Sequence, residues 1–243
     1  MRIQSNRFLY HVLDKWRGNS ASFSFDGNRV SSYGKHAVST TLSEILKASE
    51  IERKWIGSDL SIRTSASNPD LRIRSKKGAE LVSFSRHVEQ AWRDYNIAQL
   101  QAQSEVISAV LAEIEELTSP TRYPSACIVQ PVLSKAEELN TKVFSKLNRD
   151  AVGEARFRDI EAIQDFLNAP QKLRSEAITR FEIKQLDRWS NFFDSFETNP
   201  LTPEQRISVI ADEDATLVLA GAGSGKTSVI TAKAGYLIEV RNW

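Results

Sequence analysis

A glycine-rich stretch constrains this chain more than any other feature. It reads Ala-Gly-Ala-Gly-Ser-Gly-Lys-Thr over residues 220–227, follows the short apolar run 216–219 and precedes a helix-like stretch. Glycine accepts positive φ, so successive backbone N–H groups can turn toward one anion. The following helix adds the partial positive charge of its N-terminus. The stretch therefore predicts a phosphate-binding loop between a strand and a helix.

The side chains at the end of this loop predict nucleoside triphosphate chemistry. In such loops the lysine, here Lys226, reaches the β- and γ-phosphates, and the next hydroxyl, here that of Thr227, ligates Mg²⁺. These two residues are the candidate catalytic residues, and Thr227 is the candidate metal ligand. The candidate binding set for the cofactors ATP and Mg²⁺ is Gln205, Ala220, Gly221, Ala222, Gly223, Ser224, Gly225, Lys226, Thr227 and Ser228. The alternative is a glycine-rich turn without a ligand, which the flanking strand and helix patterns disfavour.

A second element bears on which nucleotide the loop would accept. Gln205 ends the run Leu-Thr-Pro-Glu-Gln, residues 201–205, at the start of an expected helix. A glutamine amide can donate to N7 of adenine and accept from its N6 amino group at once, so Gln205 is the candidate adenine reader. The alternative is structural: Thr202 caps the helix, Pro203 takes its first position, and Gln205 faces solvent.

These two segments resemble UvrD-type helicases of superfamily 1, and among them the helicase IV group. The resemblance rests on residues 201–205 and 217–229, including Ala220 at the loop's start and Ser228 after the threonine. It is strong over about residues 199–240 and vague before them. The resemblance implies an ATP-dependent DNA helicase that moves 3′ to 5′ on single-stranded DNA and unwinds partly duplex DNA, with no membrane association and an unknown protein partner.

Motor chemistry needs groups beyond a phosphate loop. An acidic pair must hold Mg²⁺ and orient water, and an arginine must stabilise the transition state. In the family that the chain resembles, these groups lie downstream of the loop. Residues 212–214, Asp-Glu-Asp, precede the expected strand and are expected to form a surface turn. We therefore expect the N-terminal part of a longer helicase, inactive by itself. The alternative is a non-catalytic DNA- or protein-binding module with a vestigial nucleotide site.

Hydrophobic periodicity predicts the fold class. Residues 20–75 alternate in the manner of half-buried strands, with a hairpin turn at residues 26–27, and from about residue 79 the period becomes helical. The side chains expected on the buried helix face are Leu81, Phe84, Val88 and Trp92. The expected architecture is an α+β N-terminal domain over residues 1–95, a small antiparallel sheet with a closing helix. A mostly α-helical linker or arm follows over 96–197. The first βα unit of an incomplete RecA-like α/β motor domain occupies 198–243.

Within the helical part, residues 118–124 are expected to break the chain, and further helices are expected near 131–149 and 155–196. Three tryptophans lie within the first 100 residues. For Trp92, core packing is expected, whereas Trp16 and Trp55 leave base stacking open as an alternative.

Composition narrows the remaining classes of protein. No apolar run is long enough to span a bilayer, and the lone Cys127 allows no intrachain disulfide, so we expect a cytoplasmic protein. The three histidines, His11, His36 and His87, have no zinc-site spacing. Residues 1–100 hold 16 Lys and Arg against 10 Asp and Glu, a net charge of +6. That excess suits contact with nucleic-acid phosphates, and an ordinary solvated surface is an equal alternative.

Overall fold

The computed structural model describes residues 22–33, 37–47, 49–53, 58–65, 70–75, 78–196, 200–219, 221, 223 and 225–241. The chain forms two compact units. One comprises the described residues up to Glu105 together with Thr141–Ile160, and the other comprises Val106–Asn140 and the described residues from Glu161 onward. The expected division into three domains stays a prediction. Several residues of the sequence-based predictions lie outside the described part: Trp16, Trp55, His11, His36, Ala220, Ala222 and Ser224.

The strands of the first unit form two antiparallel sheets of three strands within the described residues. The first sheet contains β1 (Ser22–Phe25), β2 (Arg29–Tyr33) and β3 (Val38–Thr41), and the second contains β4 (Glu50–Arg53), β5 (Ser58–Ile62) and β6 (Leu71–Ser75). The predicted alternation is confirmed, whereas the predicted single sheet is two sheets. Residue alternation sets the face of each strand and carries no information about which strands pair.

The turn between β1 and β2 follows the predicted hairpin chemistry. Asp26 Oδ1 accepts from the backbone N–H groups of Asn28 at 3.0 Å and Arg29 at 2.7 Å. Gly27 takes a φ of +97°, which a residue without a Cβ adopts at little cost. A short 3₁₀ helix, η1 (Leu42–Glu44), follows β3.

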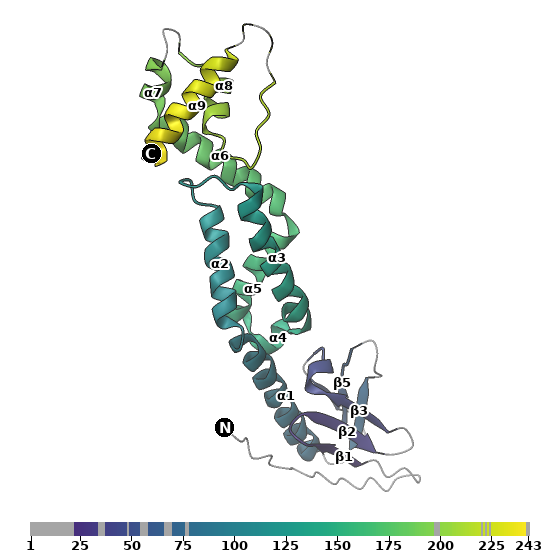
Figure 1. The fold of residues 1–243 in the computed structure, drawn as a ribbon. Coiled ribbons are helices and arrows are strands. Elements are labelled where there is room, and N and C mark those ends of the chain that lie inside the picture. The colour runs from purple at the N-terminus through teal and green to yellow at the C-terminus, as the bar shows by residue number, and fades with distance from the viewer. Residues whose placement is uncertain are drawn as a thin grey trace. The chain divides into compact units, whose positions relative to one another are not determined.

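Helix α1 (Gly78–Gln101) closes the core of this unit along the two sheets (Figure 1). Its predicted face is buried: Leu81, Phe84, Val88 and Trp92 are each at most 2% exposed. The ring of Phe84 meets the edge of Phe23 from β1 at 4.6 Å between centroids. The indole N–H of Trp92 donates to the carbonyl of Ile45 at 3.1 Å, so the polar end of a core side chain has a partner.

The mostly helical middle is confirmed, with boundaries that differ from the prediction. The further elements are α2 (Ser104–Leu117), α3 (Ala126–Lys142), the 3₁₀ helix η2 (Phe144–Lys146), α4 (Arg149–Val152), α5 (Glu154–Asn168), α6 (Pro170–Arg188) and α7 (Ser190–Ser195). The helix expected at 131–149 begins earlier and ends at Lys142. The stretch expected at 155–196 is divided, because Pro170 has no N–H for an intrahelical bond and starts a new helix instead.

Two helices flank the glycine-rich loop. Helix α8 (Pro203–Ile210) precedes it, and helix α9 (Lys226–Arg241) begins at its lysine. Both contribute to a core with α6 and α7 that includes Phe181, Phe193, Val209 and Tyr236 (Figure 1). No helix among the described residues is long and apolar enough to cross a membrane.

The predicted strand at residues 216–219 does not form. This segment has no regular secondary structure, and Leu217 and Leu219 are 81% and 85% exposed. A parallel strand is stable only when neighbouring strands satisfy its N–H and C=O groups, and no described residue pairs with this segment. The RecA-like unit therefore stays a prediction.

Candidate functional site

The start of helix α8 has the structure that its sequence predicts. Thr202 is the N-cap, Pro203 holds the first helical position, and the side chain of Thr202 accepts from the backbone N–H of Gln205 at 3.3 Å. The side-chain Oε1 of Gln205 accepts in return from the backbone N–H of Thr202 at 2.8 Å. This reciprocal capping box fixes the side chain of Gln205 at the beginning of the helix.

Two glycines of the loop before α9 have the positive φ that the sequence predicts. Gly223 and Gly225 have φ values of +76° and +79°, the left-handed region that other residues rarely adopt. The carbonyl of Gly225 accepts from the N–H of Val229 at 3.1 Å, so the loop passes directly into the first turn of α9. Lys226 and Thr227 occupy that first turn and are exposed. The positions of Lys226 and Thr227 fit a phosphate at the positive end of the helix, whereas the role of Thr227 in holding Mg²⁺ stays a prediction.

The side chain of Lys226 contacts the backbone of its own loop. Its Nζ donates to the carbonyl oxygen of Gly221 at 2.8 Å. The ammonium group of Lys226 therefore lies beside the backbone of Gly221 in the loop. A lysine in this position needs only a change of side-chain rotamer to reach an anion held by the loop's N–H groups, and the backbone can stay in place.

Gln205 and the loop are brought together by the packing of α8 against α9. A Cβ placed on Gly225 would lie 2.7 Å from the side-chain Nε2 of Gln205, which is closer than real Cβ contacts. The amide is half-buried rather than facing solvent. Its oxygen accepts from the backbone N–H of Thr202 at 2.8 Å. The predicted N-cap at Thr202, with Pro203 in the first helical position, is thus confirmed. Adenine recognition by the Gln205 amide stays a prediction.

The segment that joins α8 to the loop is anchored by its acidic residues. Glu213 Oε1 accepts from the backbone N–H of Ala126 at 2.9 Å, and Asp214 Oδ2 accepts from that of Cys127 at 2.8 Å. These two N–H groups belong to the first turn of α3, which has no acidic residue of its own. Arg174 of α6 also pairs with Glu213. The acidic run is therefore an N-terminal cap for α3, supplied from a distant part of the chain.

The environment of Asp214 changes its titration. Hydrogen bonds from the side chain and backbone of Cys127 hold the pKa of the Asp214 carboxyl below its ordinary value of 3.8. The charged carboxylate is the better acceptor for the orphan N–H groups of a helix, so the lowered pKa agrees with a capping role.

Helices α8 and α9 are also joined by polar contacts. Lys233 of α9 donates to the carbonyl of Val209 at 3.2 Å and to that of Ala211, at the C-terminal end of α8, where a cation is favoured. Arg206 of α8 donates to the carbonyl of Leu201 at 2.8 Å and pairs with Asp194 of α7 at 2.6 Å. These contacts hold the helix that carries Gln205 in a fixed position beside α9.

Helix α9 is held on its other side by a buried polar group. Gln185 of α6 is 4% exposed, and its Oε1 accepts from Trp189 Nε1 at 3.2 Å and from the hydroxyl of Tyr236 at 3.5 Å. Burial raises the pKa of Tyr236 to about 12, so the phenol stays protonated and donates at neutral pH.

The described members of the predicted binding set thus gather at one place: Gln205, Gly221, Gly223, Gly225, Lys226, Thr227 and Ser228. Their roles in binding ATP and Mg²⁺ stay predictions. Sequence reasoning missed the anchors of the site, Glu213, Asp214 and Lys233. The missing acidic residue in the first turn of α3 is a signal that a cap must come from elsewhere. No local pattern points to the residue that supplies it.

The sequence that forms this loop and its flanking helices is similar to a known family. Residues 201–243 match the UvrD/REP helicase N-terminal domain. This span holds α8, the connecting segment and α9, so the family match and the assembled site fall on the same residues. This part of the chain is therefore similar to UvrD-type helicases, in agreement with the resemblance of its two motifs.

Among individual proteins, the chain is similar to DNA helicase IV of Escherichia coli (strain K12), with 29% identity over 176 residues. The match covers 69% of this chain and 25% of the helicase, so the chain spans about a quarter of that relative's length. No solved structure matches the chain.

Proposed function

We propose that this chain supplies the nucleotide-binding loop of an ATP-dependent DNA helicase. In the proposal, Lys226 contacts the phosphates of ATP, Thr227 holds Mg²⁺, and Gln205 recognises adenine. The complete motor couples ATP hydrolysis to 3′-to-5′ movement on single-stranded DNA and to unwinding of duplex DNA. The direction of movement rests on the resemblance to UvrD-type helicases alone.

One observation carries the proposal: the Gln205 amide lies against Gly225 of the loop, at the helix end where Lys226 and Thr227 begin α9. Gln205 and Lys226, which lie 21 positions apart in sequence, are thereby brought to the same loop. A glycine-rich turn with only a structural role would not need this juxtaposition. The bound Mg²⁺ would neutralise developing phosphate charge, whereas the residues of this chain bind and orient.

The acidic residues closest in sequence to the loop are engaged elsewhere. Glu213 and Asp214 cap α3, so their carboxylates are directed at backbone N–H groups rather than at a metal ion. Among the described residues, no group of three or more His, Cys, Asp and Glu side chains could hold a metal ion. In the proposal, the residues of this chain bind and orient the nucleotide, and no part in activating water is assigned to them. A non-catalytic binding module is the alternative.

A chimeric protein tests the proposal directly. Residues 1–243 of this chain are joined to the part of E. coli DNA helicase IV that follows its matched region. ATP hydrolysis is measured with and without single-stranded DNA. We expect DNA-stimulated turnover in the chimera, a preference for ATP over GTP, and no turnover by the 243-residue chain alone. Guanine presents O6 where adenine presents its N6 amino group, so the Gln205 amide should discriminate between them.

Substitutions in the chimera separate the proposal from the binding-module alternative. Lys226→Ala is expected to reduce turnover to background, because the phosphate contact is lost. Lys184→Ala is the matched control, since this exposed lysine of α6 precedes Lys226 by 42 residues in the sequence and is not part of the loop. Equal turnover in the two variants, or DNA-stimulated hydrolysis that survives Lys226→Ala, would contradict the role of the loop.

A further inference from the structure

A groove in the first unit lies between β4 and the start of α1, on elements that contain none of the predicted nucleotide-site residues. It encloses about 660 Å³. The lining residues are Ile51, Arg53, Ser58, Gly78, Ala79, Val82, Ser83, Arg86 and His87. Within that lining, the half-buried Ile51 and Val82 are apolar, and the charged groups belong to Arg53 and Arg86. None of these lining residues is acidic.

Strand geometry explains how the groove acquires its charge. Successive side chains of a strand point to opposite faces, so Ile51 and Arg53 of β4 lie on one face and Glu50 and Glu52 on the other. Arg53 pairs in register with Ser58 of β5, which places both on the groove side. Strand β4 is an outer strand of its sheet within the described residues, so the groove opens beside it.

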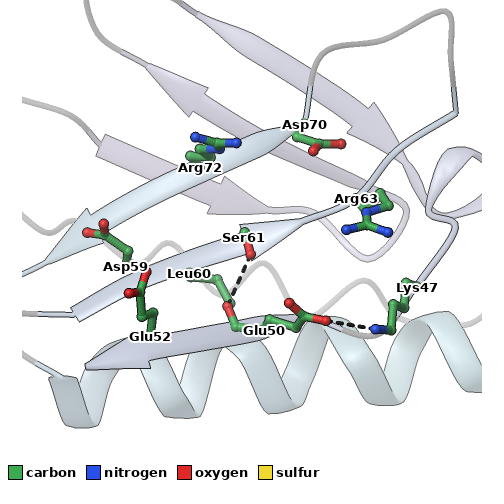
Figure 2. A pocket seen from close by; sticks show the side chains of 9 residues that line it. All are labelled: Lys47, Glu50, Glu52, Asp59, Leu60, Ser61, Arg63, Asp70 and Arg72. Atoms are coloured by element: carbon green, nitrogen blue, oxygen red, sulfur yellow. Dashed lines mark hydrogen bonds and ion pairs between the residues drawn. The ribbon is translucent and has the colours of Figure 1, made fainter. Parts of the chain in front are cut away.

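The opposite face of the same sheet has a different charge balance. Figure 2 shows four carboxylates there, those of Glu50, Glu52, Asp59 and Asp70, beside three cations. The cations are Lys47, Arg63 and Arg72, and Lys47 is paired with Glu50 at 2.8 Å. A phosphate chain would meet repulsion on this face and attraction in the groove.

The two arginines of the groove are available for a ligand. Both side chains are exposed, and within the part of the chain that the structure describes neither guanidinium has a carboxylate partner within 4.0 Å. The ring of His87 is fixed by a hydrogen bond from its Nδ1 to the carbonyl of Ser83 at 2.7 Å. In the sequence, Lys54 directly follows Arg53, and residues 76–77, both lysine, directly precede Gly78, so the adjoining chain is basic as well.

We propose that this groove binds the phosphate backbone of single-stranded DNA, as a second contact that is independent of the nucleotide-binding loop. Planar guanidinium groups suit phosphate oxygens, and an apolar floor without acids suits a sugar–phosphate chain. The groove is a seam between one strand and one helix, which accommodates a single strand rather than a duplex. No Phe, Tyr or Trp side chain lines it, so we expect binding to be independent of base sequence and strongly dependent on salt. The identification of the bound polyanion as DNA rests on the proposed function. The positive charge of the groove is independent of that proposal.

Fluorescence anisotropy of the 243-residue chain with a labelled single-stranded oligothymidine tests the proposal. The double variant Arg53→Glu/Arg86→Glu reverses the groove charge, and Arg63→Glu/Arg72→Glu applies the same charge change to the opposite face. We expect the groove variant to weaken binding by about tenfold or more at low salt, and the control by less than about threefold. The dependence of log K on log salt should become shallower by about 1.4 in the groove variant, since about 0.7 is lost for each single-strand phosphate contact.

Three results would overturn the proposal: equal weakening by both double variants, unchanged binding in the groove variant, or preference for a duplex of equal length. If the charge-reversed variant does not fold, as judged by circular dichroism, Arg53→Gln/Arg86→Gln removes the charge and keeps the side-chain length. The anisotropy experiment uses no nucleotide, so DNA binding that depends on the groove would stand even if the ATP experiment failed.

Discussion

The contact between Gln205 and the loop makes a quantitative prediction about two glycines with nearly the same backbone. Gly223 and Gly225 both have φ near +80°, at +76° and +79°. A Cβ on Gly223 would meet nothing within 4 Å, whereas a Cβ on Gly225 would lie 2.7 Å from Gln205 Nε2. Alanine at either position therefore brings the same backbone strain, and only at Gly225 does it also displace a neighbour.

The expected losses of stability follow from the backbone strain and from the displacement of Gln205. Left-handed backbone costs a residue with a Cβ about 1 kcal/mol, which is the full effect expected for Gly223→Ala. Displacing Gln205 breaks its capping contact with Thr202, which contributes about 1 kcal/mol more, so Gly225→Ala should cost about 2 kcal/mol. Gln205→Ala alone should cost about 1 kcal/mol. The double variant Gly225→Ala/Gln205→Ala should cost about 2 kcal/mol, because the cap is lost only once.

Hydrogen–deuterium exchange of the peptides that cover α8 and α9 measures these local free energies. The expected signature is a coupling of about 1 kcal/mol between Gln205 and Gly225, and none between Gln205 and Gly223. Equal costs for Gly223→Ala and Gly225→Ala, with additive double variants at both positions, would refute the placement of the Gln205 amide against the loop.

Two further predictions concern the parts that support the site. Phe84→Ala should lower the unfolding free energy of the first unit by about 3–5 kcal/mol in urea, because Phe84 is fully buried against Phe23, whereas the exposed Arg93→Ala should change it by less than about 1 kcal/mol. Since the folded pKa of Asp214 is lowered, its contribution is present above the ordinary value of 3.8 and is lost as pH falls through the lower folded pKa. Between about pH 5 and pH 2 the wild type should therefore lose more urea resistance than Asp214→Asn, and equal losses would contradict the charged cap.

The sequence predicted the elements that depend on short-range patterns. The helical period around Phe84 and Trp92 identifies the face that is buried, and the alternation around Phe23 identifies a strand with one face in the core. The capping box at Thr202 and Gln205 is likewise readable, because its partners lie three residues apart. Each of these features is determined by residues within a few turns or one hairpin.

Features that depend on distant partners could not be predicted. Glu213 and Asp214 meet the N-terminus of α3 across 87 residues of sequence, and an acidic run before an apolar segment looks the same whether it is solvated or capping. The strand expected at residues 216–219 has suitable residues and no strand beside it within the described part of the chain. An apolar composition indicates that a segment prefers burial. Whether the segment forms a strand depends on the presence of a neighbouring strand that pairs with it.

The segment that connects α8 to α9 is anchored at both of its ends, and this anchoring affects the conformational entropy of the loop. Asp214 is tied to α3, and α9 is tied to α8 by Lys233, so the backbone between residues 214 and 226 already spans two fixed points. Closing a loop between fixed points costs conformational entropy once, when the chain folds, and that cost grows slowly with length, by about 0.6 kcal/mol for each doubling. A ligand that orders this segment therefore starts from a closed loop rather than from a free chain. For the same reason, a few residues inserted among positions 216–219 should be tolerated by the flanking helices.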